Sequence, residues 1–186
     1  MTGVINNPIL LDASQTAIEN IFNLISAANL STPVTPDLVT LGTPAVWNAS
    51  DDTWRNSQVV ATALPRSPWY GTQLLKYHRI DISTELGIDI SIDQNASTTI
   101  AGILTALVNK IKLIPGQVKF DVTSIPTPNP GDDSVTVNLQ AIVGSLAYIG
   151  SVPVKLTGFT ASNVRRQQDG TIRLLMSGTT RLLDAA

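Results

Sequence analysis

The stretch Gly87-Ile88-Asp89-Ile90-Ser91-Ile92-Asp93 alternates apolar and polar residues without a break. Because neighbouring side chains of a β-strand point to opposite faces, it predicts a half-buried strand with an isoleucine face and a solvated Asp/Ser face. Directly afterwards the apolar spacing changes to the period of an α-helix. We expect that helix from Ser97, which can cap it, to about Lys112, ahead of Pro115-Gly116. Its apolar stripe is Ile100, Ile103, Leu104 and Leu107.

A second amphipathic helix is expected from Ser14 to Ala28, with a stripe made of Ile18, Ile21, Phe22 and Ile25. Runs of β-branched residues between turn residues predict further strands. They cover Val39–Val46, Ser57–Leu64, Thr72–Ile82, Val118–Ser124, Ser134–Val143, Gly150–Phe159 and Thr171–Met176. The sequence therefore predicts an α+β fold that is mostly antiparallel β.

A helix followed by about three strands occurs twice in this order, which is typical of an internal duplication. Similar residues also recur at offsets of 77 to 82 positions. Two interpretations remain open: two tandem helix-plus-three-strand repeats, or two ordinary αβ stretches. We expect units at residues 1–95 and 96–186, the second with the C-terminal strand, which have separate cores or share one. The matched residues are Thr16, Ile18 and Ile21 with Thr98, Ile100 and Ile103; Ser57 and Val60 with Ser134 and Val137; Ala63, Ser67 and Tyr70 with Ala141, Ser145 and Tyr148; and Gly71 and Lys76 with Gly150 and Lys155.

The composition excludes several classes of function. The 186 residues include 12 basic and 14 acidic ones, a net charge of −2, so there is no basic field to attract nucleic acid. The absence of cysteine rules out disulfides, cysteine–zinc sites and cysteine nucleophiles, and one histidine cannot build a multi-histidine metal site. No apolar run approaches the ~20 residues that span a bilayer. We expect no cofactor, no metal, no nucleic-acid partner and no membrane partner.

Two polar motifs suggest chemistry, and each has a simpler explanation. Asp89–Asn95 places oxygen ligands at alternate positions, as an EF-hand loop does, but Gln94 and Ile100 stand where that loop needs Gly and Glu. A strand face explains the pattern better. His78 near Asp81 could form part of a hydrolase triad, but no G-x-S-x-G motif presents a serine. A histidine that is partly buried or paired with a carboxylate is the preferred interpretation.

Four large aromatic residues gather in a turn-rich region: Trp47, Trp54, Trp69 and Tyr70. Trp and Tyr are enriched among interface hot spots, so these residues are candidate interaction residues. They could equally seal the edge of a small core. Exposed tryptophans could also stack on sugar rings, which makes a carbohydrate- or receptor-binding module an alternative function.

Four motifs between Asp37 and Asp81 resemble a small β-rich domain of virion structural proteins from large-genome (jumbo) tailed bacteriophages. That family begins a strand with Arg-Asn-Ser/Thr, continues through a glycine-rich Ser/Tyr turn and ends with Tyr-x-Arg-Ile/Leu-Asp. In this chain the turn carries Arg66, Pro68 and Trp69 where the family is usually rich in glycine. The motifs are Asp37-Leu38-Val39-Thr40-Leu41-Gly42-Thr43-Pro44, Arg55-Asn56-Ser57, Ala63-Leu64-Pro65-Arg66-Ser67-Pro68-Trp69-Tyr70-Gly71 and Tyr77-His78-Arg79-Ile80-Asp81.

The resemblance implies a non-enzymatic structural protein of the virion, made in the host cytoplasm, with no catalytic residues to assign. Its expected partners are other virion proteins and further copies of itself. The tail, baseplate or fibre region is the expected location, and head decoration or the neck is the alternative.

Overall fold

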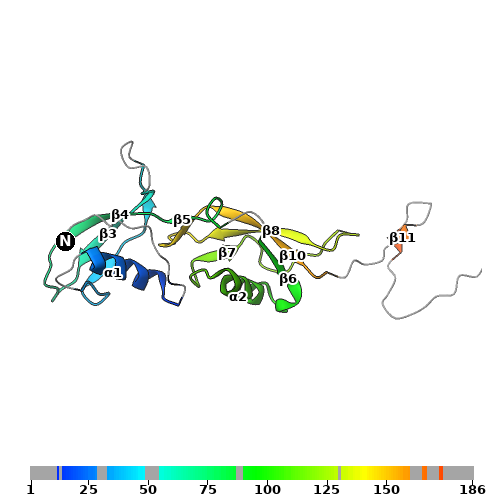
Figure 1. The fold of residues 1–186 in the computed structure, drawn as a ribbon, viewed down its shortest axis with the longest axis horizontal. Helices are drawn as coiled ribbons and strands as arrows, with labels where there is room; N and C mark the ends of the chain where they lie inside the picture. The colour runs from blue at the N-terminus through cyan, green and yellow to red at the C-terminus, as the bar shows by residue number, and fades with distance from the viewer. Residues whose placement is uncertain are drawn as a thin grey trace, which may run out of the picture.

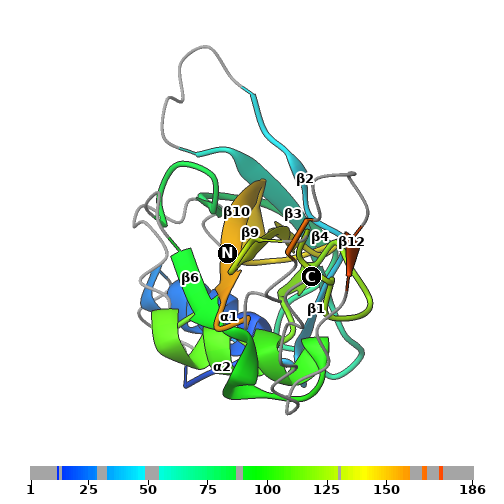
Figure 2. The ribbon, with the colours of Figure 1, turned by 90° about the vertical axis from the view of Figure 1, so that its right-hand side faces the viewer.

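The computed structural model of the chain describes residues 12, 14–28, 33–48, 55–86, 90–129, 131–159, 165–166 and 172–173. These residues form two α-helices and several sheets in which most strand pairings are antiparallel, so the predicted α+β class is confirmed. Each helix lies beneath its own sheet, and the two helix–sheet units follow one another along the long axis (Figure 1). The view along that axis shows both helices on one side of the strands (Figure 2).

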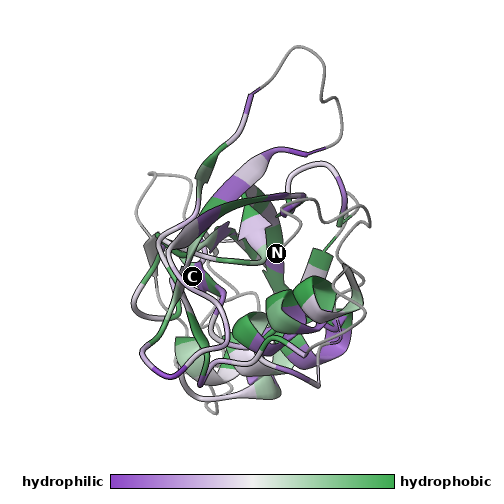
Figure 3. Cartoon of the chain, turned by 90° about the vertical axis from the view of Figure 1, so that its left-hand side faces the viewer, coloured by the Kyte–Doolittle hydropathy of each residue, from purple (hydrophilic) through white to green (hydrophobic). Residues whose placement is uncertain are grey.

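In the first unit, helix α1 (Ala17–Ala28) packs against a four-stranded sheet. The central strand is β3 (Ser57–Ala63); β1 (Val39–Leu41) and β2 (Ala45–Val46) pair with one side of it and β4 (Thr72–Tyr77) with the other, all antiparallel. Apolar residues of the helix and of the strands form one buried cluster, and Figure 3 shows apolar segments in both the helix and the strands above it. The buried cluster is Ile21, Phe22, Ile25, Val34, Val39, Val59, Ala61, Leu75 and Tyr77.

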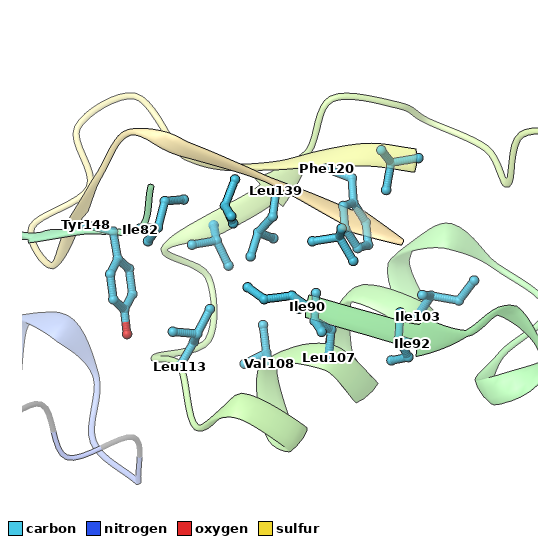
Figure 4. Close-up of a cluster of buried hydrophobic side chains, with 14 of the residues drawn as sticks. Ile82, Ile90, Ile92, Ile103, Leu107, Val108, Leu113, Phe120, Leu139 and Tyr148 are labelled. Atoms are coloured by element: carbon cyan, nitrogen blue, oxygen red, sulfur yellow. The ribbon is translucent and has the colours of Figure 1, made fainter. Parts of the chain in front are cut away.

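The second unit places α2 (Ile100–Ile111) under a sheet with the strand order β6–β10–β8–β7. β7 (Val118–Phe120) and β10 (Ser151–Thr157) flank β8 (Val135–Ala141) in antiparallel pairing. Figure 4 shows Ile103, Leu107 and Val108 of the helix pointing into the core that Phe120 and Leu139 also enter. Leu146 packs against both core clusters.

The antiparallel ladders of the two sheets have the same register. Adding 79 to the β1 and β4 numbers and 78 to the β3 numbers converts each residue pair of β1–β3 and β3–β4 into a pair of β7–β8 and β8–β10. The buried pair Val59–Leu75 thus corresponds to the buried pair Val137–Val154. The predicted match of Val60 with Val137 is one residue out of phase, because Val60 is on the exposed face of its strand.

Two short strands lead from the first sheet into the second, and both pairings are parallel. β5 (Ile80–Asp81) pairs with β9 (Tyr148–Ile149), and β6 (Ile90–Asp93) pairs with β10. Gly150 permits the first approach and Gly158 the second, because a Cβ at either position would collide with the side chain of Asp81 or Asp93. β6 therefore lies before the expected boundary at residue 95, while its partner strand lies after it.

Several element boundaries differ from the predicted ones for local reasons. α1 begins at Ala17 because Thr16 and Glu19 form a capping box, with Glu19 N donating to Thr16 Oγ1 (3.2 Å) and Thr16 N to Glu19 Oε2 (2.7 Å). Ile18, predicted on the buried stripe, is 46% exposed in the first turn. The cap of α2 is Thr99, whose Oγ1 accepts from Gly102 N, and not Ser97. Pro44 separates β1 from β2.

The end of the chain carries two further short strands. β11 (Arg165–Arg166) and β12 (Ile172–Arg173) pair with each other in antiparallel fashion. The predicted strand Thr171–Met176 is thus a strand at 172–173, and its other residues lie outside the described part of the chain.

The turn after β3 contains a strained residue. Ser67 N donates to Leu64 O (3.0 Å) across Pro65 and Arg66, and Arg66 has a φ of 79°. The same contact joins Ser145 N to Ile142 O in the second unit, where the residue with φ 79° is Gly144. A positive φ at the third turn position is typical of a type II turn and favours glycine.

We expect Arg66→Gly to stabilise the protein and Gly144→Arg to destabilise it. The first change removes a side chain from a left-handed position and the second introduces one, so each shifts the free energy of unfolding by about 1 kcal/mol in opposite directions. Urea denaturation of the two variants beside the unmodified chain measures both. A loss of stability in Arg66→Gly would contradict the turn assignment.

Candidate functional site

Residues of two separated motifs meet where the first sheet gives way to the second. Arg79 follows β4, and Asn56 precedes β3. Arg79 N donates to Asn56 Oδ1 (2.8 Å), and Asn56 Nδ2 donates to the Arg79 carbonyl (2.7 Å). These reciprocal bonds hold the chain at the point where β4 ends, which is why the predicted strand Thr72–Ile82 is split into β4 and β5.

Arg79 is only 7% exposed, and its guanidinium lies between the two units. Its Nε donates to Ser57 Oγ (2.6 Å) in the first sheet, and its Nη1 donates to the Ser145 carbonyl (3.1 Å) in the second unit. Both partners are neutral, and burial lowers the pKa of Arg79. A buried cation is costly unless it is hydrogen-bonded, so these contacts fix the relative position of the units.

The second unit contributes a matching set of hydrogen bonds around Ser145. Ser145 Oγ donates to Gln117 Oε1 (3.0 Å) and accepts from Tyr148 N (3.0 Å). Gln117 Oε1 also accepts from Leu146 N (2.9 Å). The turn that offers its carbonyl to Arg79 is therefore held rigidly. We call Asn56, Ser57, Arg79, Gln117 and Ser145 the polar junction.

The candidate aromatic residues do not form one cluster in the described structure. Trp47 is half-buried, and Lys76 Nζ lies 3.6 Å from the centroid of its ring, which is a cation–π geometry. Trp69 packs against the first core. Tyr70 is 98% exposed, and Trp54 lies outside the described residues. Tyr70 is thus the described aromatic side chain most accessible to a partner.

Comparison with known families places these elements in one domain family. Residues 11–162 match a family of unknown function, DUF7941. The chain belongs to this family. The matched range covers both helices, both large sheets and the polar junction. Searches of curated proteins and of solved structures gave no match.

The outer face of the first sheet in this DUF7941 domain, opposite α1, carries exposed apolar residues. Val60 and Leu74 stand directly opposite each other in the β3–β4 ladder and are 43% and 39% exposed. Val46 of β2 is 63% exposed as well, but it pairs with buried Ser57 and is therefore on the α1 side of the sheet. At the positions of Val60 and Leu74 the second sheet has Asn138 and Pro153. We call Trp47, Val60 and Leu74 the apolar outer face.

The second sheet is polar at the corresponding place. Asn138 N and Nδ2 donate to the two carboxylate oxygens of Asp121 (3.0 and 2.8 Å). These bonds hold the pKa of Asp121 below its usual value. Sequence reasoning missed this difference between the sheets because it matched Val60 with Val137, whereas the register makes Asn138 the counterpart of Val60.

The two polar motifs adopt the simpler arrangements. His78 Nε2 lies 2.8 Å from Glu85 Oε1, while the Asp81 carboxylate accepts from Ser83 N (2.9 Å). The preferred interpretation, a histidine paired with a carboxylate, is thus confirmed, with Glu85 as the partner. Asp93 accepts from Asn95 N (2.8 Å) at the end of β6. Asp89 lies outside the described residues.

Within the described parts of the chain, acidic and histidine side chains nowhere gather in a group of three that could hold a metal ion. A search of the same residues for a helix long and apolar enough to cross a membrane finds none.

Two buried tyrosines differ in whether their hydroxyls are bonded. Tyr148 Oη accepts from Ile114 N (2.9 Å), whereas Tyr77 Oη has no hydrogen-bond partner among the described residues. Burial raises the pKa of both phenols above the ordinary value near 10. Their folded forms therefore favour the neutral state. The stability that this provides is complete below pH ~10 and is lost as pH rises above it, because only the unfolded chain ionises there.

We expect Tyr77→Phe to raise the free energy of unfolding at pH 7 by about 1 kcal/mol, because it removes an unpaired buried hydroxyl. Tyr148→Phe should lower it by about 1–2 kcal/mol, because Ile114 N then loses its partner. Tyr77→Phe should also reduce the decline in stability above pH 10. Urea titrations at pH 7 and pH 10.5 measure both effects. Equal losses in the two variants would contradict the assigned hydrogen bonding.

We expect Arg79→Met to cost about 3 kcal/mol, because it leaves buried partners of the guanidinium unpaired. It should also loosen the attachment of the two units, so that the amides of the first sheet exchange with solvent before those of the second. Hydrogen exchange read by mass spectrometry, beside chemical denaturation, measures this. Lys119→Met is the matched control on an exposed strand position, with an expected change within about 0.5 kcal/mol.

Proposed function

We propose that this protein is a non-enzymatic structural component of a tailed-phage virion. It acts by assembly with copies of itself and with other virion proteins, in the tail, baseplate or fibre region. Head decoration or the neck is the alternative location. The protein is made in the host cytoplasm and becomes part of the particle.

The observation that carries this proposal is the use made of the motif residues. Asn56, Ser57 and Arg79 belong to two of the motifs that resemble virion proteins, and they form hydrogen bonds with each other and with the Ser145 carbonyl. These bonds join the two units. Motif residues that fix the relative position of two sheets are suited to a structural protein, which acts through its shape and its contacts.

The surface supports assembly as well. Charged residues make up only 14% of the chain, below the ~25% usual for soluble domains. The apolar outer face and the fully exposed Tyr70 add side chains of the kind enriched at interfaces. A surface with few charges and with exposed apolar side chains is typical of a protein that is buried against neighbouring subunits, and less typical of a free monomer.

We also propose that the two units are tandem repeats. Their shared register supports this, and so do two local details. Gly71 and Gly150 have φ of 79° and 80°, and each accepts a bond from an alanine, Ala63 N or Ala141 N (3.0 and 3.1 Å). Two unrelated sheets are not expected to share the same strand register, the same glycine conformation and the same hydrogen bond.

The test of the virion role is the composition of the particle. We expect mass spectrometry of gradient-purified virions to find the protein, and immunogold electron microscopy to label one position on intact particles. A label at the tail or baseplate supports the first location, and a label at the head or neck supports the alternative. Presence only in lysates and never in purified particles would overturn the proposal.

A further inference from the structure

The outer edge of β4 is open, whereas the same edge of β10 is filled. β6 pairs with the outer side of β10, and β5 pairs with the adjoining strand β9. Among the described residues no strand pairs with the outer side of β4. If the two units are repeats, β4 is the counterpart of β10, and the first sheet lacks the two strands that complete the second.

The peptide groups of β4 are turned towards this open side. Ala63 N donates to Gly71 O (3.0 Å), so the alternation of an antiparallel ladder points the N–H and C=O groups of Thr72, Leu74 and Lys76 away from β3. The Leu74 carbonyl accepts one bond, from the neighbouring Gln73 side chain (3.3 Å). A row of unpaired peptide groups is a template for a further strand.

The described residues also leave empty the space beside β4 where a counterpart of β5 would lie. A Cβ at Gly150 would collide with Asp81 of β5, but a Cβ at the counterpart Gly71 would meet nothing within 4 Å. Tyr70, next to Gly71, is 98% exposed. In the second unit the residue Tyr148, before Gly150, is buried at the contact with β5.

The chain itself carries a segment suited to this edge. The first sheet is followed by two short strands, β5 and β6, which pair with the next unit. The second sheet is likewise followed by two, β11 and β12, which among the described residues pair with each other. In the sequence Thr171-Ile172-Arg173-Leu174-Leu175-Met176, apolar residues stand at the alternate positions 172, 174 and 176, as they do at 90 and 92 in β6, and Leu175 is apolar as well.

We propose that the C-terminal segment of one copy, residues 160–186, adds to the Tyr70–Tyr77 edge of a second copy. The contact repeats the one that β5 and β6 make with β9 and β10 inside the chain. The contact is head-to-tail, so an open oligomer keeps a free β4 edge at one end and a free C-terminal segment at the other. Such an oligomer can extend into a filament or close into a ring. This inference rests on the proposed role in assembly and names the surface and the partner.

The experiment uses two full-length variants that each remove one half of the contact. Lys76→Pro deletes an outward N–H from the edge; Pro153 already occupies an outward position of β10. The double variant Ile172→Pro with Leu174→Pro prevents the segment from pairing. Lys76→Thr, which loses the contact with Trp47 but keeps the N–H, is the control for the edge. Circular dichroism and thermal melting check that each chain folds.

We expect sedimentation velocity to show oligomers of the unmodified chain that grow with concentration, and the same for Lys76→Thr. Each blocked variant alone should sediment as a monomer of 19.8 kDa. Their mixture should form a 1:1 dimer of twice that mass and nothing larger, because one intact edge meets one intact segment. If Lys76→Pro does not fold, Gly71→Asn replaces it, since Asn tolerates the positive φ and fills the space beside the edge.

The outcomes separate this inference from the virion role. A monomeric unmodified chain at all concentrations, blocked variants that still oligomerise, or a mixture without the dimer would each overturn the head-to-tail contact, even if the protein is found in particles. Head-to-tail assembly in solution of a protein that purified virions lack would uphold the contact and overturn the virion role.

Discussion

A buried guanidinium with neutral partners holds the molecule together at its centre. The cation of Arg79 keeps its place only because Ser57 of the first sheet and the Ser145 carbonyl of the second unit both accept from it. Removing either unit would expose the desolvated cation or leave it without a partner. The same residue ends β4 through Asn56 and directs the chain into β5, whose pairing with β9 begins one residue later. The geometry of both sheets therefore depends on this one side chain.

The sequence predicted the helices and strands, which depend on local periodicity. It did not predict which strands pair with each other over long distances in the chain. Both helices and most strands follow from the 3.6- and 2-residue periods, so they were found within a few residues. The parallel pairing of β6 with β10 involves residues more than 60 positions apart, and alternation alone identifies a strand without its partner. The one-residue error at Val60 has the same origin, since two adjacent valines leave the buried face undecided. Of the candidate site, the motif residues were identified but their convergence was not, because a serine carbonyl leaves no signal in a sequence.

The two sheets share a register, but they differ in whether their outer edge and outer face are covered. The second sheet protects its outer edge with β6 and its outer face with the Asn138–Asp121 bonds and Pro153. In the first sheet no described strand covers the outer edge of β4, and the outer face carries Val60 and Leu74. Exposed edges and apolar faces are aggregation risks that monomeric proteins commonly suppress. The concentration of both on one sheet argues that the first sheet is the one that receives a partner.

The position of Lys76 strengthens this argument. A lysine in an edge strand usually discourages pairing, because its charge projects across the edge into solvent. Here the ammonium group lies over the Trp47 ring on the face of the sheet, 3.6 Å from its centroid. The aromatic ring thus holds the charge against the face and away from the outward-pointing peptide groups. The position of Trp47 thus favours the proposed strand addition, because the ring holds the charge of Lys76 on the face of the sheet and leaves the edge accessible.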